Sequence, residues 1–159
     1  MSDADEVVAR FGHVAEHAPW VAERAARRGP FADRAAVAAA FAAVVREAHP
    51  AEQVDLIAAH PELAGRAAAE GDLTPASAAE QASAGLDRLA PGDLARLRAV
   101  NAHYRTRFGV PFVIRVRGRS IAEILEAGEA RLGNEADEER RIAVEEIADI
   151  MRIRIEETP

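Results

Sequence analysis

The stretch HPELAGRAAAEGDLTPASAAEQASAGL, residues 60–86, is the part of the chain around which the rest is organised. His60 stands directly before Pro61, and proline disfavours the helical region for the preceding residue while fitting the first position of a helix. We therefore expect His60 at the entrance of a helix that starts at Pro61, with its ring facing a cleft. Thr74 before Pro75 repeats this pattern, a hydroxyl cap followed by a first-turn proline.

A helix that starts at Pro75 would carry three polar groups on one face. Ser77, Glu80 and Gln81 are spaced i, i+3 and i+4 and therefore lie side by side. The opposite face carries small residues, on which we expect a neighbouring element to pack: Ala78, Ala79 and Ala82. Each feature also has a structural explanation, because a histidine before a proline often serves as a cap and Ser77-x-x-Glu80 matches the capping-box pattern.

Composition predicts an all-α protein. The chain has 159 residues, which fits one domain over 1–159 with its own core. Alanine, leucine, glutamate and arginine dominate while only 4% of residues are aromatic, a profile typical of helices. With no cysteine, a disulfide framework, a thiolate nucleophile and Cys-ligated zinc are excluded, and a reducing cytoplasm suits the chain.

Charge and hydropathy limit the partners. The net charge is −7 and the pI is about 5.3, which argues against broad affinity for nucleic acid or an anionic membrane. No apolar run approaches the roughly 20 residues that span a bilayer, and MSDADEVVARFG at the N-terminus lacks the pattern of a signal peptide. We expect a cytoplasmic protein.

Periodicity predicts about eight to nine helices. Apart from the two starts at Pro61 and Pro75, the expected helical ranges are 2–11, 19–28, a run capped by Asp33 and closed by Pro50, 51–59, 91–108, 121–132 and 135–156. We expect Trp20, with Val21 and Ala25, to anchor the helix over 19–28 in the core. The segment FVIRV at 112–116 is the exception, because β-branched residues favour a strand there, and we expect an extended or irregular segment.

Two other patterns have simpler explanations than chemistry. His13, Glu16 and His17 match H-x-x-E-H, the zinc motif of one metalloprotease class. Pro19 breaks any helix there two residues later, so we expect no metal site. The arginines at 115, 117 and 119 suggest a basic patch, but in an acidic chain we expect them to be solvated or paired with carboxylates.

Five segments in one order carry a family resemblance across nearly the whole chain. They are EHAPWVAE at 16–23, QVDLIAAHPELAGR at 53–66, LTPASAAEQASAGLDRL at 73–89, NAHYRTRFGVPFVIRVRGRS at 101–120 and EIADIMRIRIE at 146–156. Together they resemble the OHCU decarboxylases, which convert 2-oxo-4-hydroxy-4-carboxy-5-ureidoimidazoline (OHCU) to (S)-allantoin during urate breakdown. The resemblance implies an all-α carboxy-lyase that needs no cofactor and no metal and that forms a homodimer.

The resemblance also assigns roles. His60 would be the general acid/base, since its reference pKa of about 6.5 suits proton transfer near neutral pH. Glu80 would hydrogen-bond the substrate or the imidazole, and Arg154 would hold substrate oxygens through its fork of donors. Substrate contacts would be completed by Pro61, Ser77, Gln81, Phe112, Val113 and Ile114, the last three through main-chain groups. We expect His60, Glu80 and Arg154 to converge on one small cavity.

Two other interpretations remain open at this point. The first is a non-catalytic helical module that binds a purine-derived ligand beside His60. The second is an interaction protein whose acidic helices pair with a partner. The first would bind allantoin without turning OHCU over. The second would place His60, Glu80 and Arg154 far apart, with no pocket between them.

Overall fold

The computed structural model describes residues 3–65, 68 and 71–159. Within these residues the chain forms eight α-helices, a 3-10 helix and no strand, which confirms the all-α prediction. The helices are α1 (Ala4–Phe11), η1 (Gly12–Val14), α2 (Pro19–Ala26), α3 (Arg34–Glu47), α4 (Pro50–Ala58), α6 (Pro75–Ser83), α7 (Pro91–Phe108), α8 (Ile121–Arg131) and α9 (Ala136–Glu157). None of the helices within this part of the chain is both long and apolar enough to cross a bilayer.

Polar caps explain where several helices begin. Asp33 accepts a hydrogen bond from the Ala36 N–H and starts α3, while Ser120 and Glu123 form a capping box at the start of α8. At the C-terminal end of α7, Gly109 has φ +75°, the left-handed conformation that suits a glycine after a helix. These boundaries agree with the sequence patterns because they depend on local groups.

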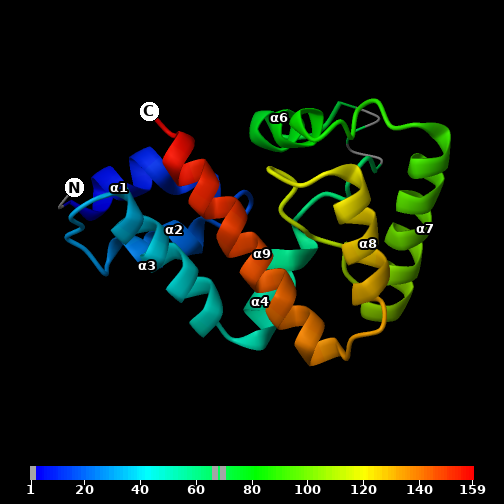
Figure 1. Ribbon diagram of the computed structural model, residues 1–159. Helices are drawn as coiled ribbons and strands as arrows, with labels where there is room; N and C mark the ends of the chain where they lie inside the picture. The colour runs from blue at the N-terminus through cyan, green and yellow to red at the C-terminus, as the bar shows by residue number, and fades with distance from the viewer. Residues whose placement is uncertain (1–2, 66–67, 69–70) are drawn as a thin grey trace. The chain divides into compact units, whose positions relative to one another are not determined.

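The chain divides into two compact units, residues 1–59 with 144–159 and residues 60–143. In the first unit, α1 packs on α2 and α2 on α3 (Figure 1). Its core is made of apolar side chains that are at most 2% exposed, among them Phe11, Val21, Phe41, Leu56, Ile147 and Ile155. The prediction that Trp20, Val21 and Ala25 anchor this helix in the core is confirmed for Val21 and Ala25, which are fully buried. Trp20 is only partly buried, with the Arg24 guanidinium 4.5 Å from its ring centroid.

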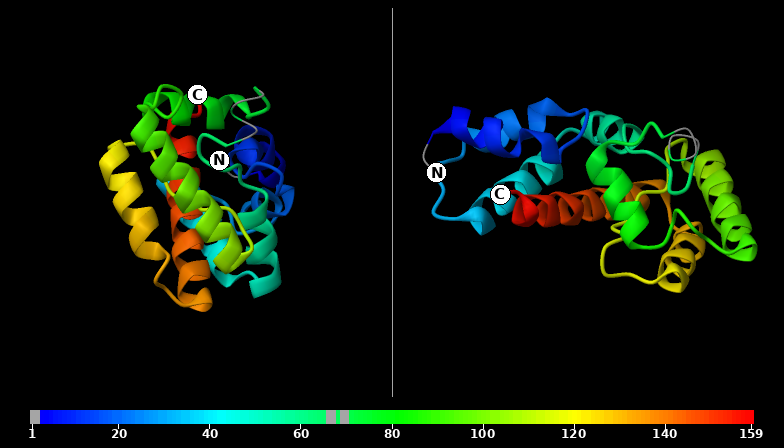
Figure 2. Two further views of the ribbon diagram at one scale, coloured as in Figure 1. Left: turned by 90° about the vertical axis from the view of Figure 1, so that its right-hand side faces the viewer. Right: turned by 90° about the horizontal axis from the view of Figure 1, so that it is seen from above.

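The second unit is built on the pair of α7 and α8, which lie side by side in the views of Figures 1 and 2. Gly128 allows their close approach, since a Cβ there would stand 2.7 Å from Val100 Cγ1 and 3.1 Å from the Phe112 ring. The unit has one core cluster: Leu63, Leu86, Leu97, Val100, Tyr104, Phe112, Ile114, Val116, Ile124 and Leu125. This cluster holds the turn after His60 and the segment 112–116 in the same unit.

Candidate functional site

His60 is half-buried and lies two residues beyond the end of α4. Residues 61–65 that follow are a non-helical turn, so the predicted helix start at Pro61 is wrong. Ala64 has φ +47°, a left-handed value that a helix cannot contain and that non-glycine residues rarely adopt. Backbone strain of this kind persists only where surrounding contacts impose it.

Three contacts within the second unit impose this turn. The Leu63 carbonyl accepts a hydrogen bond from Asn101 Nδ2 at 3.0 Å, and the Ala64 N–H donates to Gln81 Oε1 at 2.9 Å. Glu62 forms an ion pair with Arg105 Nε at 2.9 Å. These tertiary contacts take backbone groups that a helix would have paired internally, which explains why the local proline signal does not decide the structure here. They also anchor the turn directly after His60 to α6 and α7.

The helix that starts at Pro75 forms as predicted, with Thr74 as its cap. Thr74 Oγ1 accepts a hydrogen bond from the Ser77 N–H at 3.2 Å. Because Ser77 therefore lies inside the first turn, the capping-box explanation for Ser77 and Glu80 is wrong. Ser77 and Glu80 lie on the same face as Gln81 because the three residues are spaced i, i+3 and i+4 in α6.

Helix α6 buries its polar face and exposes its alanine face, whereas an ordinary amphipathic helix buries its apolar face. Ser77 and Gln81 are each only 6% exposed and Glu80 is half-buried, whereas Ala78 and Ala79 are exposed. The prediction that a neighbouring element packs on the alanine face is therefore wrong at these two positions. Burying hydroxyl and amide groups costs free energy unless they are hydrogen-bonded, so a buried polar face is a feature that needs an explanation.

Gln81 shows how this polar face is oriented. The Ala64 N–H is a donor, so the Gln81 atom that faces it must be the oxygen, and the side-chain amide cannot be flipped. The two Nε2 hydrogens therefore point away from Ala64. A fixed amide donor on a buried face is suited to bind a ligand carbonyl or ring nitrogen.

Residues 111–116 are neither helix nor strand, as the sequence predicts for 112–116. The side chains of Phe112, Val113 and Ile114 are at most 4% exposed. Phe112 also packs with its ring centroid 5.6 Å from that of Tyr104. Since these side chains belong to the core, any contact with a ligand would come from the main chain of this segment, in keeping with the expectation of main-chain binding.

A buried charged cluster next to this segment is absent from the sequence predictions. Arg131 is 7% exposed and Glu139 is 1% exposed, and their side chains form an ion pair. The Tyr104 hydroxyl donates to Glu139 Oε1 at 2.6 Å. Burial and this hydrogen bond raise the pKa of Tyr104, which keeps the hydroxyl protonated and able to donate. The only sequence signal for the cluster is an arginine that ends a helix and a glutamate in the first turn of the next.

Arg154 lies in the first unit and is 6% exposed, although its position near the C-terminus suggests a surface residue. Its Nη1 donates to the Val14 carbonyl at 3.1 Å and forms an ion pair with Glu16 Oε1 at 2.9 Å. Both contacts hold the same nitrogen and so orient the plane of the guanidinium.

The pairing of Glu16 also bears on the H-x-x-E-H pattern. His13 lies in η1, and His17 lies in a turn with φ +61°, so the two histidines do not share the helical face that the zinc motif requires. Among the described residues no cluster of three or more histidine or acidic side chains is arranged to hold a metal ion. Glu16 instead contacts Arg154.

The arginines at 115, 117 and 119 are half-buried rather than fully solvated. Arg115 Nη1 donates to the Arg117 carbonyl, and Arg119 Nη1 donates to the Arg115 carbonyl at 3.0 Å. These bonds to main-chain oxygens stabilise the turn around Gly118, where φ is +76°. A basic patch aimed at an external partner is not required to explain the three residues.

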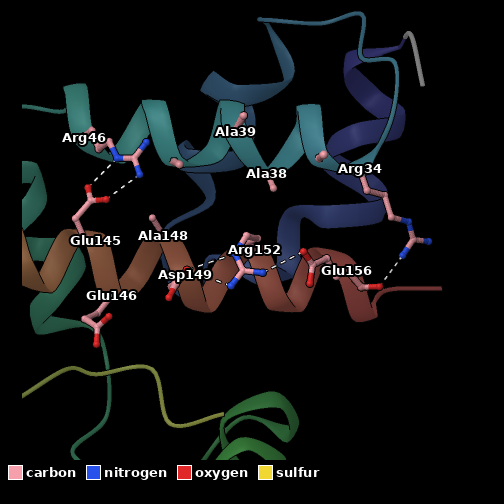
Figure 3. Close-up of a pocket in the computed structure, with 12 residues that line it drawn as sticks. Arg34, Ala38, Ala39, Arg46, Glu145, Glu146, Ala148, Asp149, Arg152 and Glu156 are labelled. Carbon is pink, nitrogen blue, oxygen red and sulfur yellow. Dashed lines mark hydrogen bonds and ion pairs between the residues drawn. The ribbon is translucent and has the colours of Figure 1, made fainter. Parts of the chain in front are cut away.

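A groove of about 550 Å³ in the first unit lies between α3 and α9 (Figure 3). Alanines of α3 line it, and ion pairs border it: Arg46–Glu145 at 2.7 Å and Arg152–Asp149 at 3.2 Å. Its described lining contains none of the predicted site residues. Arg152 also pairs with Glu156 at 3.1 Å, and Arg34 donates to the Ile155 carbonyl at 3.2 Å. Since most of the charged groups there already have protein partners, we do not assign the candidate site to this groove.

Comparisons with known proteins agree with the resemblance seen in the five segments. The family model described as OHCU decarboxylase matches residues 1–156. A 2-oxo-4-hydroxy-4-carboxy-5-ureidoimidazoline decarboxylase of Amia calva is 40% identical over 153 residues, which cover 96% of this chain and 87% of that protein. A protein of the same name from Haloferax volcanii is 38% identical over 155 residues, covering 98% of this chain and 90% of the relative.

A solved structure has the same fold. The crystal structure of an OHCU decarboxylase in the presence of (S)-allantoin superposes with a TM-score of 0.71 at 24% identity. The match covers 95% of this chain and 94% of the other. At this identity the likeness establishes the fold, while the sequence relatives establish the family.

Proposed function

Because the chain belongs to the OHCU decarboxylase family, we propose that it converts OHCU to (S)-allantoin and carbon dioxide. The structural observation that supports this proposal is the reversed burial of α6. That helix buries Ser77 and Gln81 and exposes Ala78 and Ala79. A small polar substrate explains a buried polar face better than core packing does.

The substrate can supply its own electron sink. Loss of carbon dioxide leaves an electron pair, and many decarboxylases delocalise it into pyridoxal phosphate or thiamin diphosphate. In OHCU the carboxylate is on a carbon that bears a hydroxyl and adjoins a ring C=N bond, so the ring can accept the pair. The protein then needs only to orient the substrate and transfer protons.

His60 is the proposed general acid/base, acting on the substrate hydroxyl and on proton return. The turn after it is held by Asn101 and Gln81, which limits the freedom of the backbone next to the imidazole. Glu80 would bind a substrate nitrogen or raise the basicity of the imidazole, as a neighbouring carboxylate does. Delivery of the proton to one face would give a single enantiomer.

The remaining roles concern recognition. Arg154 would hold substrate oxygens with a guanidinium that is oriented by Glu16 and Val14. Gln81 would donate from Nε2, and the main chain of Val113 and Ile114 would bind the ureido or imidazolone edge. The other contacts proposed on the family resemblance come from Pro61, Ser77 and Phe112.

The proposal is tested with freshly generated OHCU, by following allantoin formation and its enantiomeric composition. His60→Asn and Glu80→Gln should each lower kcat by about 10²–10⁴-fold, the range for a lost acid/base group. The matched controls are His103→Asn in α7 and Glu126→Gln in α8, both at exposed positions, which should keep wild-type activity. Full activity in both site variants would refute the assigned roles.

A wild-type protein that leaves the spontaneous decay of OHCU unchanged would refute the function itself. If such a protein still gained thermal stability with allantoin, the result would favour the non-catalytic ligand-binding module. The homodimer remains a proposal from the family resemblance, and the cytoplasmic location remains a proposal from the composition of the sequence. Sedimentation equilibrium tests the homodimer directly, because a monomer mass at micromolar concentration would exclude it.

A further inference from the structure

Arg131 and Glu139 form a buried cluster of charged side chains, which is unusual in a protein interior. Arg131 Nε donates to Glu139 Oε1 at 2.5 Å, and Asn134 Nδ2 donates to Glu139 Oε2 at 3.1 Å. Both charged residues are more than nine-tenths buried. Removing two charges from water costs free energy that their attraction only partly returns, and apolar replacement of such pairs is often neutral or stabilising. Stability alone is therefore a weak explanation for this pair.

Arg131 makes further contacts, and these lie on the segment 112–116. Its Nη1 donates to the Val113 carbonyl at 2.7 Å. Its guanidinium also stands 4.9 Å from the centroid of the Phe112 ring. One side chain at the end of α8 thus holds both a ring and a carbonyl of a segment that has no helix or sheet hydrogen bonds of its own.

The hydrogen bond to Val113 determines the direction of the next amide. The Val113 carbonyl and the Ile114 N–H belong to one planar trans peptide and point in opposite directions. Among the described residues, the Ile114 N–H donates to no hydrogen-bond acceptor, although Ile114 is only 4% exposed. Buried N–H groups nearly always have a partner. This donor is therefore suited to an oxygen or ring nitrogen of a bound molecule.

We propose that Arg131 is a positioning residue for the decarboxylation: by holding the Val113 carbonyl, it aims the Ile114 N–H at the substrate. Glu139 in turn orients Arg131, with Tyr104 and Asn134 completing the hydrogen bonds of that carboxylate. The inference rests on the proposed function, because it takes OHCU as the molecule that Ile114 binds. Arg131 itself contacts neither the substrate nor the reacting atoms.

The test uses two variants of the full chain. Arg131→Lys keeps a positive charge beside Glu139 but lacks the planar fork that reaches Glu139 and Val113 together. The double variant Arg131→Met with Glu139→Met removes both charges, so no uncompensated charge remains buried. Both should raise KM for OHCU about tenfold, the effect of one lost hydrogen bond, with a smaller change in kcat. The control is Arg96→Met, which breaks the exposed Arg96–Glu129 pair between α7 and α8 and should leave KM unchanged.

Nuclear magnetic resonance gives a second readout besides activity. In the wild-type protein, titration with allantoin should shift the amide resonance of Ile114, and this shift should shrink in both variants. A folded variant with wild-type KM and a wild-type Ile114 shift would overturn the inference. Failure of both variants to fold would assign Arg131 a purely structural role and would equally overturn it.

The two proposals fail in distinguishable ways. A wild-type protein that does not accelerate OHCU decarboxylation refutes the proposed function. An active wild-type protein with unaffected Arg131 variants refutes only the positioning role.

Discussion

Helices α3 and α6 are both rich in alanine, yet they use their faces in opposite ways. The buried face of α3 holds Val37, Ala40, Phe41, Val44 and Val45, whereas its other alanines are exposed or half-buried. The buried face of α6 holds Ser77 and Gln81, and its alanines Ala78 and Ala79 are exposed.

The difference separates stability from function. Apolar burial on α3 stabilises the first unit by roughly 25 cal/mol for each Å² removed from water. The polar face of α6 gives no comparable gain, because its groups must exchange water for protein hydrogen bonds. We infer that α6 keeps this face for a ligand, and the following changes test the contrast.

Among the changes that compare α6 with α3, the largest expected effect is that of Gln81→Leu on the buried face of α6. The change leaves the Ala64 N–H without its acceptor, which should lower the free energy of unfolding by about 1–3 kcal/mol. It also removes a proposed substrate donor, so KM for OHCU should rise about tenfold. Urea unfolding and steady-state kinetics measure the two effects. Ser83→Ala at the exposed end of α6 is the control, and a Gln81→Leu variant with wild-type KM would contradict the ligand-binding interpretation.

A matched pair of alanine substitutions compares the two helices directly. Ala40 of α3 is 8% exposed, so Ala40→Leu should overpack the core and lower the free energy of unfolding by about 1–3 kcal/mol. Ala79 of α6 is exposed, so Ala79→Leu should change it by less than about 0.5 kcal/mol. Urea denaturation of both variants gives the comparison. Equal losses would mean that the alanine face of α6 is packed after all.

The smallest expected effect concerns the ion pair between α3 and α9. The hydrogen bond from Arg46 holds the pKa of Glu145 below its ordinary value of 4.5, so the pair adds stability above pH 4.5 and loses it as pH falls through the folded pKa. Both side chains are about half exposed, so Glu145→Gln should cost less than about 1 kcal/mol at pH 7. This difference should shrink as the pH falls below 4.5 and disappear once the pH is below the folded pKa of Glu145, as measured by urea unfolding over a series of pH values. A difference that persists in acid would contradict the electrostatic explanation.

Several predictions succeed because they depend on local chemistry. Asp33, Thr74 and Ser120 cap the helices that follow them, and Gly109 ends α7. The family assignment is confirmed by the OHCU decarboxylase family model, which matches residues 1–156. The roles of His60, Glu80 and Arg154 stay predictions, as does their convergence on one cavity.

Other predictions fail where tertiary contacts oppose local preference. Pro61 does not start a helix, since Ala64 and Leu63 hydrogen-bond to Gln81 and Asn101 instead of to their own turn. Trp20 is only partly buried, although tryptophan is large and apolar.

The sequence by itself determined the all-α class, most helix boundaries and the family, because caps, prolines and periodicity act over a few residues and the family segments span the chain. Only the tertiary structure decided which face of α6 is buried, that Arg154 lies inside, and that Arg131 holds the Val113 carbonyl. Those outcomes depend on partners that are distant in sequence, as Gln81 is from Ala64 and Arg131 from Val113, and no local pattern specifies such pairings.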